Sequence, residues 1–141
     1  MNFPIEFNVS CSSISGISLS WKSKYDGGLI KCSIPNCFEG PGDGASPEDF
    51  YALALLNCFI ATFKIYAEKS KLSYEKIEGN AKLAVEKNSS NFPSLGKVIL
   101  NFYLFSVDKQ DRAERILNKV KSQSILINSV KSKVEINWSF E

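Results

Sequence analysis

The sequence predicts an α+β fold in which antiparallel strands wrap around one long, buried central helix. Three observations lead to this prediction. Apolar and polar residues alternate in several short segments, a run without charges follows a glycine-rich loop, and a second helical segment has a single apolar stripe. A chain of 141 residues is long enough to form one core. We therefore expect a single domain that covers residues 1–141.

The composition excludes several classes of protein. The charged fraction is 23% and the net charge is +2, which is too small an excess for a nucleic-acid-binding surface. The apolar run without charges at 50–63 has 14 residues, whereas a bilayer requires about 20. The N-terminal "MNFPIEFNVS" has no basic segment followed by an apolar one, so it does not resemble a secretory signal. We expect a cytoplasmic protein without nucleic-acid or membrane partners.

The N-terminal third is expected to form antiparallel strands. Apolar residues occupy every second position from Phe3 to Val9 and from Ile17 to Trp21, which is typical of half-buried strands. The segment "YDGG", Tyr25 to Gly28, is a hairpin turn signal before a third strand near 29–34. Glycine and proline in "FEGPGDGA" then interrupt regular structure and lead into the first helix.

The first helix has a well-defined start. Ser46 suits the N-cap, Pro47 the first helical position, and Asp49 the acidic position of a capping box. The helix should continue to about Ser70. Between Phe50 and Phe63 its apolar residues face every direction, so it must be covered on all sides. A sheet and the second helix could do this, or another subunit could cover part of it, and we favour an obligate homodimer.

The C-terminal half should contain two long strands, a helix and a last strand. The strands are expected at 74–86 and 97–107, the second rich in aromatic and β-branched residues. Asp108 is expected to cap an amphipathic helix over 109–122. The apolar stripe of that helix consists of Ala113, Ile116, Leu117 and Val120. The last strand has apolar residues at Val134, Ile136, Trp138 and Phe140.

The chain contains no histidine, which excludes much catalytic chemistry. Ser-His-Asp triads, Cys-His pairs and HExxH zinc sites all require an imidazole. Glycine loops that bind nucleotides are also absent. The four cysteines are irregularly spaced, and "CSIPNC" alone is a weak zinc signal, so we expect neither a metal nor another cofactor. A thiolate is the nucleophile that remains.

Cys58 lies in the middle of the apolar helix. A cysteine in such a place usually acts as a small hydrophobic residue. The neighbouring Asn57 would need hydrogen-bond partners if it were buried, which hints at a polar pocket. The other three cysteines, Cys11, Cys32 and Cys37, are more simply interpreted as strand or loop residues.

The segment "CFEGPGDGASPEDFYALALLNCFIATF", 37–63, resembles the OsmC/Ohr family. In that family a glycine-rich loop, a "[TS][NS]PE" helix start and a cysteine ten residues after the glutamate recur. The order of strands and helices predicted above is also similar over nearly the whole chain. The resemblance implies a thiol peroxidase that reduces organic hydroperoxides in oxidative stress defence. It also implies an intertwined homodimer with active sites at the subunit interface.

The resemblance assigns roles to two residues. Cys58 matches the peroxidatic cysteine, whose thiolate attacks the peroxide and becomes a sulfenic acid. Glu48 matches a carboxylate that orients an arginine beside that thiolate. Ten helical residues separate Glu48 from Cys58, about 15 Å along the axis, which is too far for contact within one chain. If both residues serve one site, Glu48 must come from the partner subunit.

The sequence departs from the family pattern at two positions. Ser124 stands where the family has its resolving cysteine, and a serine cannot form a disulfide. No arginine precedes Arg112, and Cys37 stands just before "FEG", where some members have their arginine. A lysine could replace the charge of an arginine but not its planar fork, and the lysines in question are Lys22, Lys24 and Lys31.

Three functions therefore stay open. The first is a peroxidase in which oxidised Cys58 is resolved by Cys37 or by an external thiol. The second is a non-catalytic module that binds a hydrophobic small molecule in an interface pocket; Phe50, with Phe59 and Phe63, is compatible with this, although core packing explains these residues equally well. The third is a redox-stress sensor in which oxidation of Cys58 alters an interaction.

Overall fold

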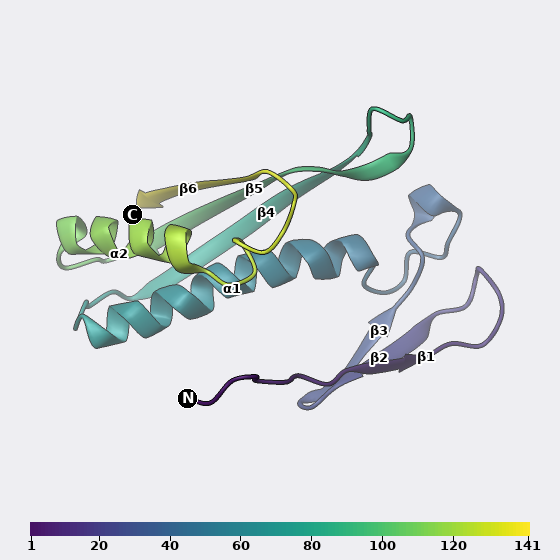
Figure 1. Ribbon diagram of the computed structural model, residues 1–141, viewed down its shortest axis with the longest axis horizontal. Coiled ribbons are helices and arrows are strands. Elements are labelled where there is room, and N and C mark those ends of the chain that lie inside the picture. The colour runs from purple at the N-terminus through teal and green to yellow at the C-terminus, as the bar shows by residue number, and fades with distance from the viewer. The chain divides into compact units, whose positions relative to one another are not determined.

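The chain forms two units in the computed structural model, which describes residues 1–141 (Figure 1). The first unit is Met1–Phe50 and the second is Tyr51–Glu141. The long helix α1, Pro47–Lys69, begins in the first unit and continues through the second. The structure is α+β, as predicted, with two α-helices and two three-stranded sheets.

The first unit is built on an antiparallel sheet in the order β1-β2-β3. Its strands are β1 (Ser10–Ser12), β2 (Trp21–Tyr25) and β3 (Gly28–Cys32). Tyr25 pairs with Gly28, so Asp26 and Gly27 form the two-residue turn that the "YDGG" signal predicts. A short 3₁₀ helix, η1 (Asn36–Phe38), follows β3 before the chain enters α1.

The two longest N-terminal alternations do not form the strands that the sequence predicts. Residues 3–9 are outside any strand and exposed, and β1 begins only at Ser10. The alternating segment 17–21 contributes only Trp21, as the first residue of β2. A period of two shows which side chains share a face, but backbone hydrogen bonds to a neighbouring strand are also needed to make a strand.

The capping box at the start of α1 is present as predicted. The backbone N–H of Asp49 donates to Ser46 Oγ at 3.0 Å, and the N–H of Ser46 donates to Asp49 Oδ2 at 2.9 Å. These two bonds satisfy two backbone donors that the helix itself leaves without partners. The helix ends at Lys69, close to the expected end at Ser70.

The second unit contains a sheet in the order β4-β5-β6 and the helix α2. The elements are β4 (Lys76–Lys87), β5 (Pro93–Phe105), α2 (Gln110–Gln123) and β6 (Val134–Phe140). β4 and β5 form an antiparallel hairpin, but β6 runs parallel to β5, contrary to the expected antiparallel pairing. The helix α2 and the segment after it return the chain to the other end of the sheet, and this crossover makes the last pairing parallel.

Asp108 does not cap α2 as predicted. The N-cap residue is Lys109, and no side chain bonds to the end of the helix there. The carboxylate of Asp108 instead accepts a hydrogen bond from the N–H of Ser73 at 3.2 Å, and the N–H of Asp108 donates to the Ser73 carbonyl. Asp108 therefore joins the start of α2 to the segment before β4.

The core of the second unit lies between one face of the sheet and the two helices. Every second residue of β5 from Val98 to Leu104 is fully buried, and Phe102 stacks on Phe59 of α1 with ring centroids 4.1 Å apart. The remaining stripe residues face the same core and are Leu55, Phe63 and Ala67 of α1 with Ala113, Ile116, Leu117 and Val120 of α2. The predicted stripe of the second helix is thus confirmed.

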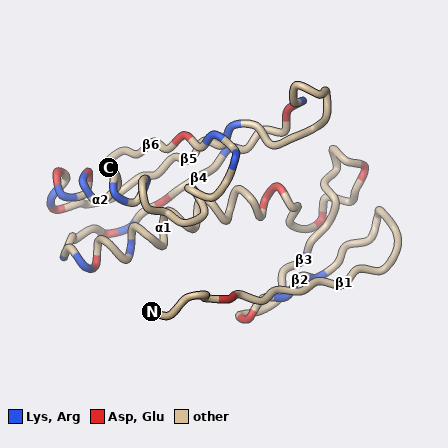
Figure 2. The backbone as a smooth tube through the Cα atoms, viewed as in Figure 1, with Lys and Arg blue, Asp and Glu red and all other residues tan.

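The opposite side of α1 lies outside the core of the second unit. Leu53 and Ile65 are 49% and 53% exposed, and Asn57 and Ala61 between them are exposed as well. Figure 2 shows that the middle of α1 carries no charge. The sequence correctly predicts that the middle of the helix is apolar on every side, but within the second unit only one of its faces belongs to the core.

The length and composition of α1 also meet the criterion for a membrane-spanning helix. Its 23 residues, with a mean hydropathy of 1.5 over the most apolar window, are long and apolar enough to cross a membrane. A core helix of a globular protein meets the same criterion, so this is weak evidence for a membrane span.

The stacked pair at the centre of the second unit should dominate its stability. Replacing Phe59 with alanine removes a ring that is 0% exposed and leaves a cavity against Phe102. We expect the free energy of unfolding to fall by about 3 to 5 kcal/mol, measured by urea denaturation. Ile125→Ala, at a 77% exposed position, should change it little. Equal effects of the two substitutions would contradict this description of the core.

Candidate functional site

Cys58 is partly buried on α1. The hydroxyl of Thr62, one turn further on, donates to the Cys58 carbonyl at 2.7 Å. Asn57 is exposed, and its Nδ2 donates to the Leu53 carbonyl of the same helix at 2.8 Å. The amide therefore finds its partner on the backbone of α1, and its presence gives no indication of a buried polar pocket.

Glu48 lies in the first turn of α1 and is partly buried. One of its carboxylate oxygens, Oε2, is buried and makes no hydrogen bond. Glu48 Oε2 is the only buried side-chain oxygen or nitrogen in the structure without a partner. Most buried polar atoms of native proteins are hydrogen-bonded, so an exception of this kind requires an explanation.

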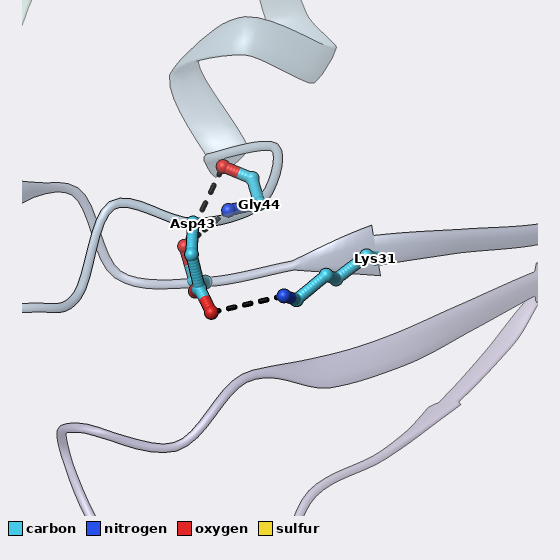
Figure 3. Close-up of polar contacts among 4 residues, drawn as sticks. Lys31, Asp43 and Gly44 are labelled. Atoms are coloured by element: carbon cyan, nitrogen blue, oxygen red, sulfur yellow. Dashed lines mark hydrogen bonds and ion pairs between the residues drawn. The ribbon is translucent and has the colours of Figure 1, made fainter.

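The loop between β3 and α1 is held by a small polar network (Figure 3). The N–H of Gly44 donates to Ser33 Oγ at 2.9 Å, and Lys31 Nζ lies 2.9 Å from Asp43 Oδ2. Gly44 approaches β3 so closely that a Cβ atom there would lie 2.8 Å from the carbonyl carbon of Cys32. The glycine-rich loop is therefore needed for close packing, which positions the first turn of α1 and Glu48.

The ion pair changes the titration of Asp43. Its hydrogen bond and charge interaction with Lys31 hold the pKa of the Asp43 carboxyl below its ordinary value, and partial desolvation opposes this shift. Both side chains are about half exposed, so the contribution of the pair to stability is small.

The sheet of the first unit has an apolar face and a basic face. The strand register places Trp21 opposite Cys32 and Ser23 opposite Ile30 on one face. The lysines alternate to the other face, where Lys22 pairs with Lys31 and Lys24 pairs with Leu29. None of the lysines that could replace the family arginine therefore belongs to the apolar face, and Lys31 is already paired with Asp43.

The apolar face borders two cavities within the first unit. One, of about 300 Å³, is lined by Trp21, Ser23, Cys32, Ala45, Pro47 and Phe50. The other, of about 320 Å³, is lined by Val9, Ser23, Lys24, Tyr25, Ile30 and Phe50. Phe50 and Ser23 line both cavities. The predicted pocket residue Phe50 therefore does line a cavity, although Phe59 and Phe63 are core residues of the second unit.

Cys32 is a strand residue, as expected, at the end of β3, and it is 1% exposed and makes polar contacts. Its sulfur lies 3.2 Å from Ser23 Oγ and 3.4 Å from the Ile30 carbonyl. The turn signal in the sequence could have shown that Cys32 and Ser23 share a face, because a two-residue turn at Asp26 and Gly27 fixes the register of β2 and β3. The individual cysteine gave no such signal.

The other two predicted site residues differ in accessibility. Cys37 is exposed on η1. Ser124 is fully buried at the C-terminal end of α2, where its hydroxyl donates to the Val120 carbonyl at 2.7 Å. No hydrogen bond or ion pair joins any two of the predicted site residues. No group of three or more Cys, Asp or Glu side chains is placed to hold a metal ion.

The sequence model of OsmC-like proteins matches residues 40–139. This chain belongs to the OsmC-like protein family. A search of curated proteins finds no match. The solved structures include three similar folds of the same size. An OsmC-like protein of unknown function from Vibrio cholerae has a TM-score of 0.81 and 20% identity, with 98% of this chain and 100% of that chain covered.

The other two structures are described as organic hydroperoxide resistance proteins. The one from Elizabethkingia anophelis, with bound thiocyanate, has a TM-score of 0.79 and 18% identity, and both chains are covered fully. A second Vibrio cholerae protein, putatively of this type, holds captopril in one of its active sites. It has a TM-score of 0.74 and 16% identity, with 98% of this chain and 95% of that chain covered. At these identities the likeness shows the OsmC-like fold.

The ion pair in this OsmC-like protein gives a prediction about pH. Because the pKa of Asp43 is lowered in the folded state, its contribution to stability is present above the ordinary aspartate pKa. That contribution is lost as the pH falls through the lowered folded pKa. Lys31→Met should raise the pKa of Asp43 toward its ordinary value, measured by NMR titration of the carboxyl carbon. Lys22→Met, on the same face but without a carboxylate partner, should leave the titration unchanged, and an unchanged titration in Lys31→Met would disprove the pairing.

Proposed function

We propose that this OsmC-like protein is a thiol-dependent peroxidase that reduces organic hydroperoxides through Cys58. The observation that carries the proposal is the position of Cys58, a partly accessible thiol on α1 that lies ten residues after Glu48 of the "SPE" helix start. Membership of the family and the printed names of the solved relatives support the same activity.

The proposed reaction begins with the Cys58 thiolate. It attacks the distal oxygen of the hydroperoxide, the O–O bond breaks, and the products are a Cys58 sulfenic acid and an alcohol. The sulfur is oxidised by two electrons and the peroxide is reduced by two. The role in the cell would be defence against oxidative stress. All four cysteines are free thiols, which suits a reducing cytoplasm.

The Cys58 sulfenic acid would be reduced back to the thiol without a disulfide between Cys58 and residue 124. Ser124 carries no thiol, and its hydroxyl is buried against the Val120 carbonyl. Cys58 is also the only cysteine in the second unit. We propose that an external thiol condenses with the sulfenic acid, releases water and is then displaced by a second thiol. The exposed Cys37 is the alternative resolving group.

We further propose that the active form is a homodimer. The uncovered stripe of α1, which contains Leu53, Asn57, Ala61 and Ile65, is mostly apolar and lies next to Cys58 along the helix. Burial of such a stripe against a second copy is favourable. Ten residues of one helix separate Glu48 from Cys58 by about 15 Å. A site with both residues would therefore take Glu48 from the partner subunit.

A second candidate function is supported by the cavities of the first unit. Two apolar cavities that share Phe50 and Ser23 could hold a hydrophobic small molecule. The captopril in one of the active sites of a relative supports a family site that admits small molecules. In this alternative, the fold would retain a pocket and Cys58 would have no catalytic role.

Treatment with an alkyl hydroperoxide should discriminate between the two functions. We expect Cys58 to become a sulfenic acid, or a mixed disulfide when a small thiol is present, because a reactive thiolate is the preferred target of peroxide. Intact and peptide mass spectrometry measures the product, and Cys58→Ser should abolish it. An unmodified Cys58 at a modest excess of oxidant would refute the peroxidase and favour the binding module.

The same experiment identifies the resolving group. If an external thiol resolves the sulfenic acid, Cys37→Ser should leave turnover unchanged. If Cys37 resolves it, a Cys37–Cys58 disulfide must form, and Cys37→Ser must increase over-oxidation to the sulfinic acid.

The dimer can be tested at the uncovered stripe of α1. Leu53→Glu should shift the protein from dimer to monomer, because burial of an unpaired carboxylate at an apolar interface is unfavourable. Analytical ultracentrifugation measures the mass in solution. Lys69→Glu introduces the same side chain at an exposed polar position near the end of the helix and should leave the dimer intact. A wild-type protein that sediments as a monomer would refute the proposal.

A further inference from the structure

Cys58 is the proposed nucleophile, and a thiol attacks as its ionised form. The chain contains no histidine, and both of its arginines lie on α2, where Arg112 Nη1 donates to the Ser70 carbonyl at 3.1 Å. On α1 itself, no charged residue occurs between Asp49 and Lys64. Support for the thiolate from within the second unit must therefore come from an uncharged hydrogen-bond donor.

The helix itself places one such donor beside Cys58. The side chains three and four positions away are the neighbours of any helical residue, and those at i and i+4 lie on the same face. For Cys58 these neighbours are Ala54, Leu55, Ala61 and Thr62. The first three are apolar, so the hydroxyl of Thr62 is the only polar group among them.

The elements that pack on α1 bring no charge to this part of the core. The core-facing residues of β4, β5 and α2 are apolar. The titratable side chains at the edge of the core are three phenols, Tyr51, Tyr66 and Tyr74. A phenol ionises at higher pH than a thiol, and burial and the charge of Glu68 raise the pKa of Tyr74 further. None of these groups can supply a positive charge to a thiolate.

The Thr62 hydroxyl is already bonded to the backbone of Cys58. Its Oγ1 donates to the Cys58 carbonyl at 2.7 Å. The backbone N–H of Thr62 bonds to the same carbonyl, because each N–H in an α-helix donates to the carbonyl four residues earlier. The hydroxyl therefore makes a second bond to an oxygen that already has a partner. Release of the hydroxyl leaves no backbone group unsatisfied.

We propose that the Thr62 hydroxyl moves from this carbonyl to the Cys58 sulfur when the thiol ionises, and that its hydrogen bond stabilises the reacting thiolate. This inference rests on the proposed peroxidase function. The carbonyl and the sulfur belong to one residue, so a hydroxyl on the carbonyl is within a side-chain rotation of the sulfur. A threonine in a helix has two accessible rotamers. A hydrogen bond to a charged acceptor is stronger than one to a neutral carbonyl, so the charge on the sulfur determines which acceptor the hydroxyl takes.

Thr62 keeps its own proton throughout the proposed step. The Cys58 S–H proton passes to water, and the thiolate attacks the distal oxygen of the hydroperoxide. The S–O bond forms as the O–O bond breaks, and the electron pair leaves on the alkoxide, which takes a proton from water. The sulfur loses two electrons and the peroxide gains them, so the products are Cys58–SOH and an alcohol. The sulfur is then neutral, and the hydroxyl returns to the carbonyl.

The test measures the rate of Cys58 alkylation by iodoacetamide as a function of pH, in a Cys11→Ser/Cys37→Ser background. Thr62→Val keeps the shape of the side chain and removes the hydroxyl. We expect it to move the midpoint of the profile upward by about one pH unit and to slow alkylation about 10-fold near neutral pH, as for the loss of one hydrogen bond to a charged group. Thr62→Ser retains the hydroxyl and should restore the background profile.

A matched control separates this role from a structural one. Threonine and serine hydroxyls often bond back to a carbonyl of their own helix, and such a bond alone would not change the pH at which Cys58 reacts. Ser122→Ala removes a hydroxyl of this kind on α2, which donates to the Lys119 carbonyl at 2.9 Å. It should leave the profile unchanged. A Thr62→Val profile equal to the background, or an equal shift in Thr62→Ser, would overturn the proposal.

A second measurement needs no substitution at position 62. Thr62 is the only threonine in the chain, so a protein with labelled threonine gives one methyl signal. Its three-bond couplings to the backbone report the rotamer of Thr62. We expect these couplings to change with the same midpoint as Cys58 alkylation, and to stay constant in Cys58→Ser. Constant couplings in the protein with Cys58 would refute the movement of the hydroxyl.

The reaction with tert-butyl hydroperoxide separates this inference from the proposed function. Alkylation and the threonine signal report ionisation of Cys58 without any peroxide. If the alkylation profile depends on Thr62 but hydroperoxide leaves Cys58 unmodified, the peroxidase proposal fails and the role of Thr62 stands. If hydroperoxide oxidises Cys58 and Thr62→Val alters neither oxidation nor alkylation, the peroxidase proposal stands and the role of Thr62 is refuted.

Discussion

The structure depends on one constraint: α1 is apolar around its circumference between Phe50 and Phe63, but only one of its sides belongs to the core of the second unit. Phe59 and Phe63 are fully buried in the core of the second unit, whereas Leu53 and Ile65 are about half exposed. Burial of such a surface is favourable, and the second unit has no further helix or strand to place there. The same stripe lies beside Cys58, so whatever covers it also determines how the thiol is reached and what surrounds it.

The elements that the sequence predicted well are those set by local chemistry. The start of α1 follows from Ser46, Pro47 and Asp49, because each contributes to helix initiation through atoms only a few residues apart. The turn at Asp26 and Gly27 is local in the same sense. The stripe of α2 is a repeated pattern within one helix, and its four residues are all buried.

The failed predictions concern partners that lie far along the chain. Residues 3–9 have the alternation of a strand, but no strand pairs with them in this chain. Asp108 has the chemistry of an N-cap, but it bonds to Ser73, which is 35 residues away. The direction of β6 is set by the path of α2 and not by its own residues. A single-sequence pattern shows what a segment can do and leaves its neighbour undetermined.

In the candidate site, too, the sequence predicted the local features and missed those that depend on distant partners. The family motif located Cys58 and Glu48. The register set by the turn places Cys32 and Ser23 on one face of the sheet, but nothing in the sequence singled out the contact between their side chains. The sequence suggested a polar pocket at Asn57, but that side chain bonds to its own helix. It also left three lysines as substitutes for an arginine, and only the alternation along β2 and β3 showed that all three belong to the basic face.

These observations connect the two departures from the family pattern. No arginine precedes Arg112, so the first unit has no guanidinium for the Glu48 carboxylate to orient, and its buried Oε2 has no hydrogen-bond partner in this chain. Without a thiol at position 124, the buried Ser124 serves as the cap of α2 and takes no part in redox chemistry. Both changes remove groups that the proposed peroxidase reaction would use, and both leave the Cys58 thiol in place.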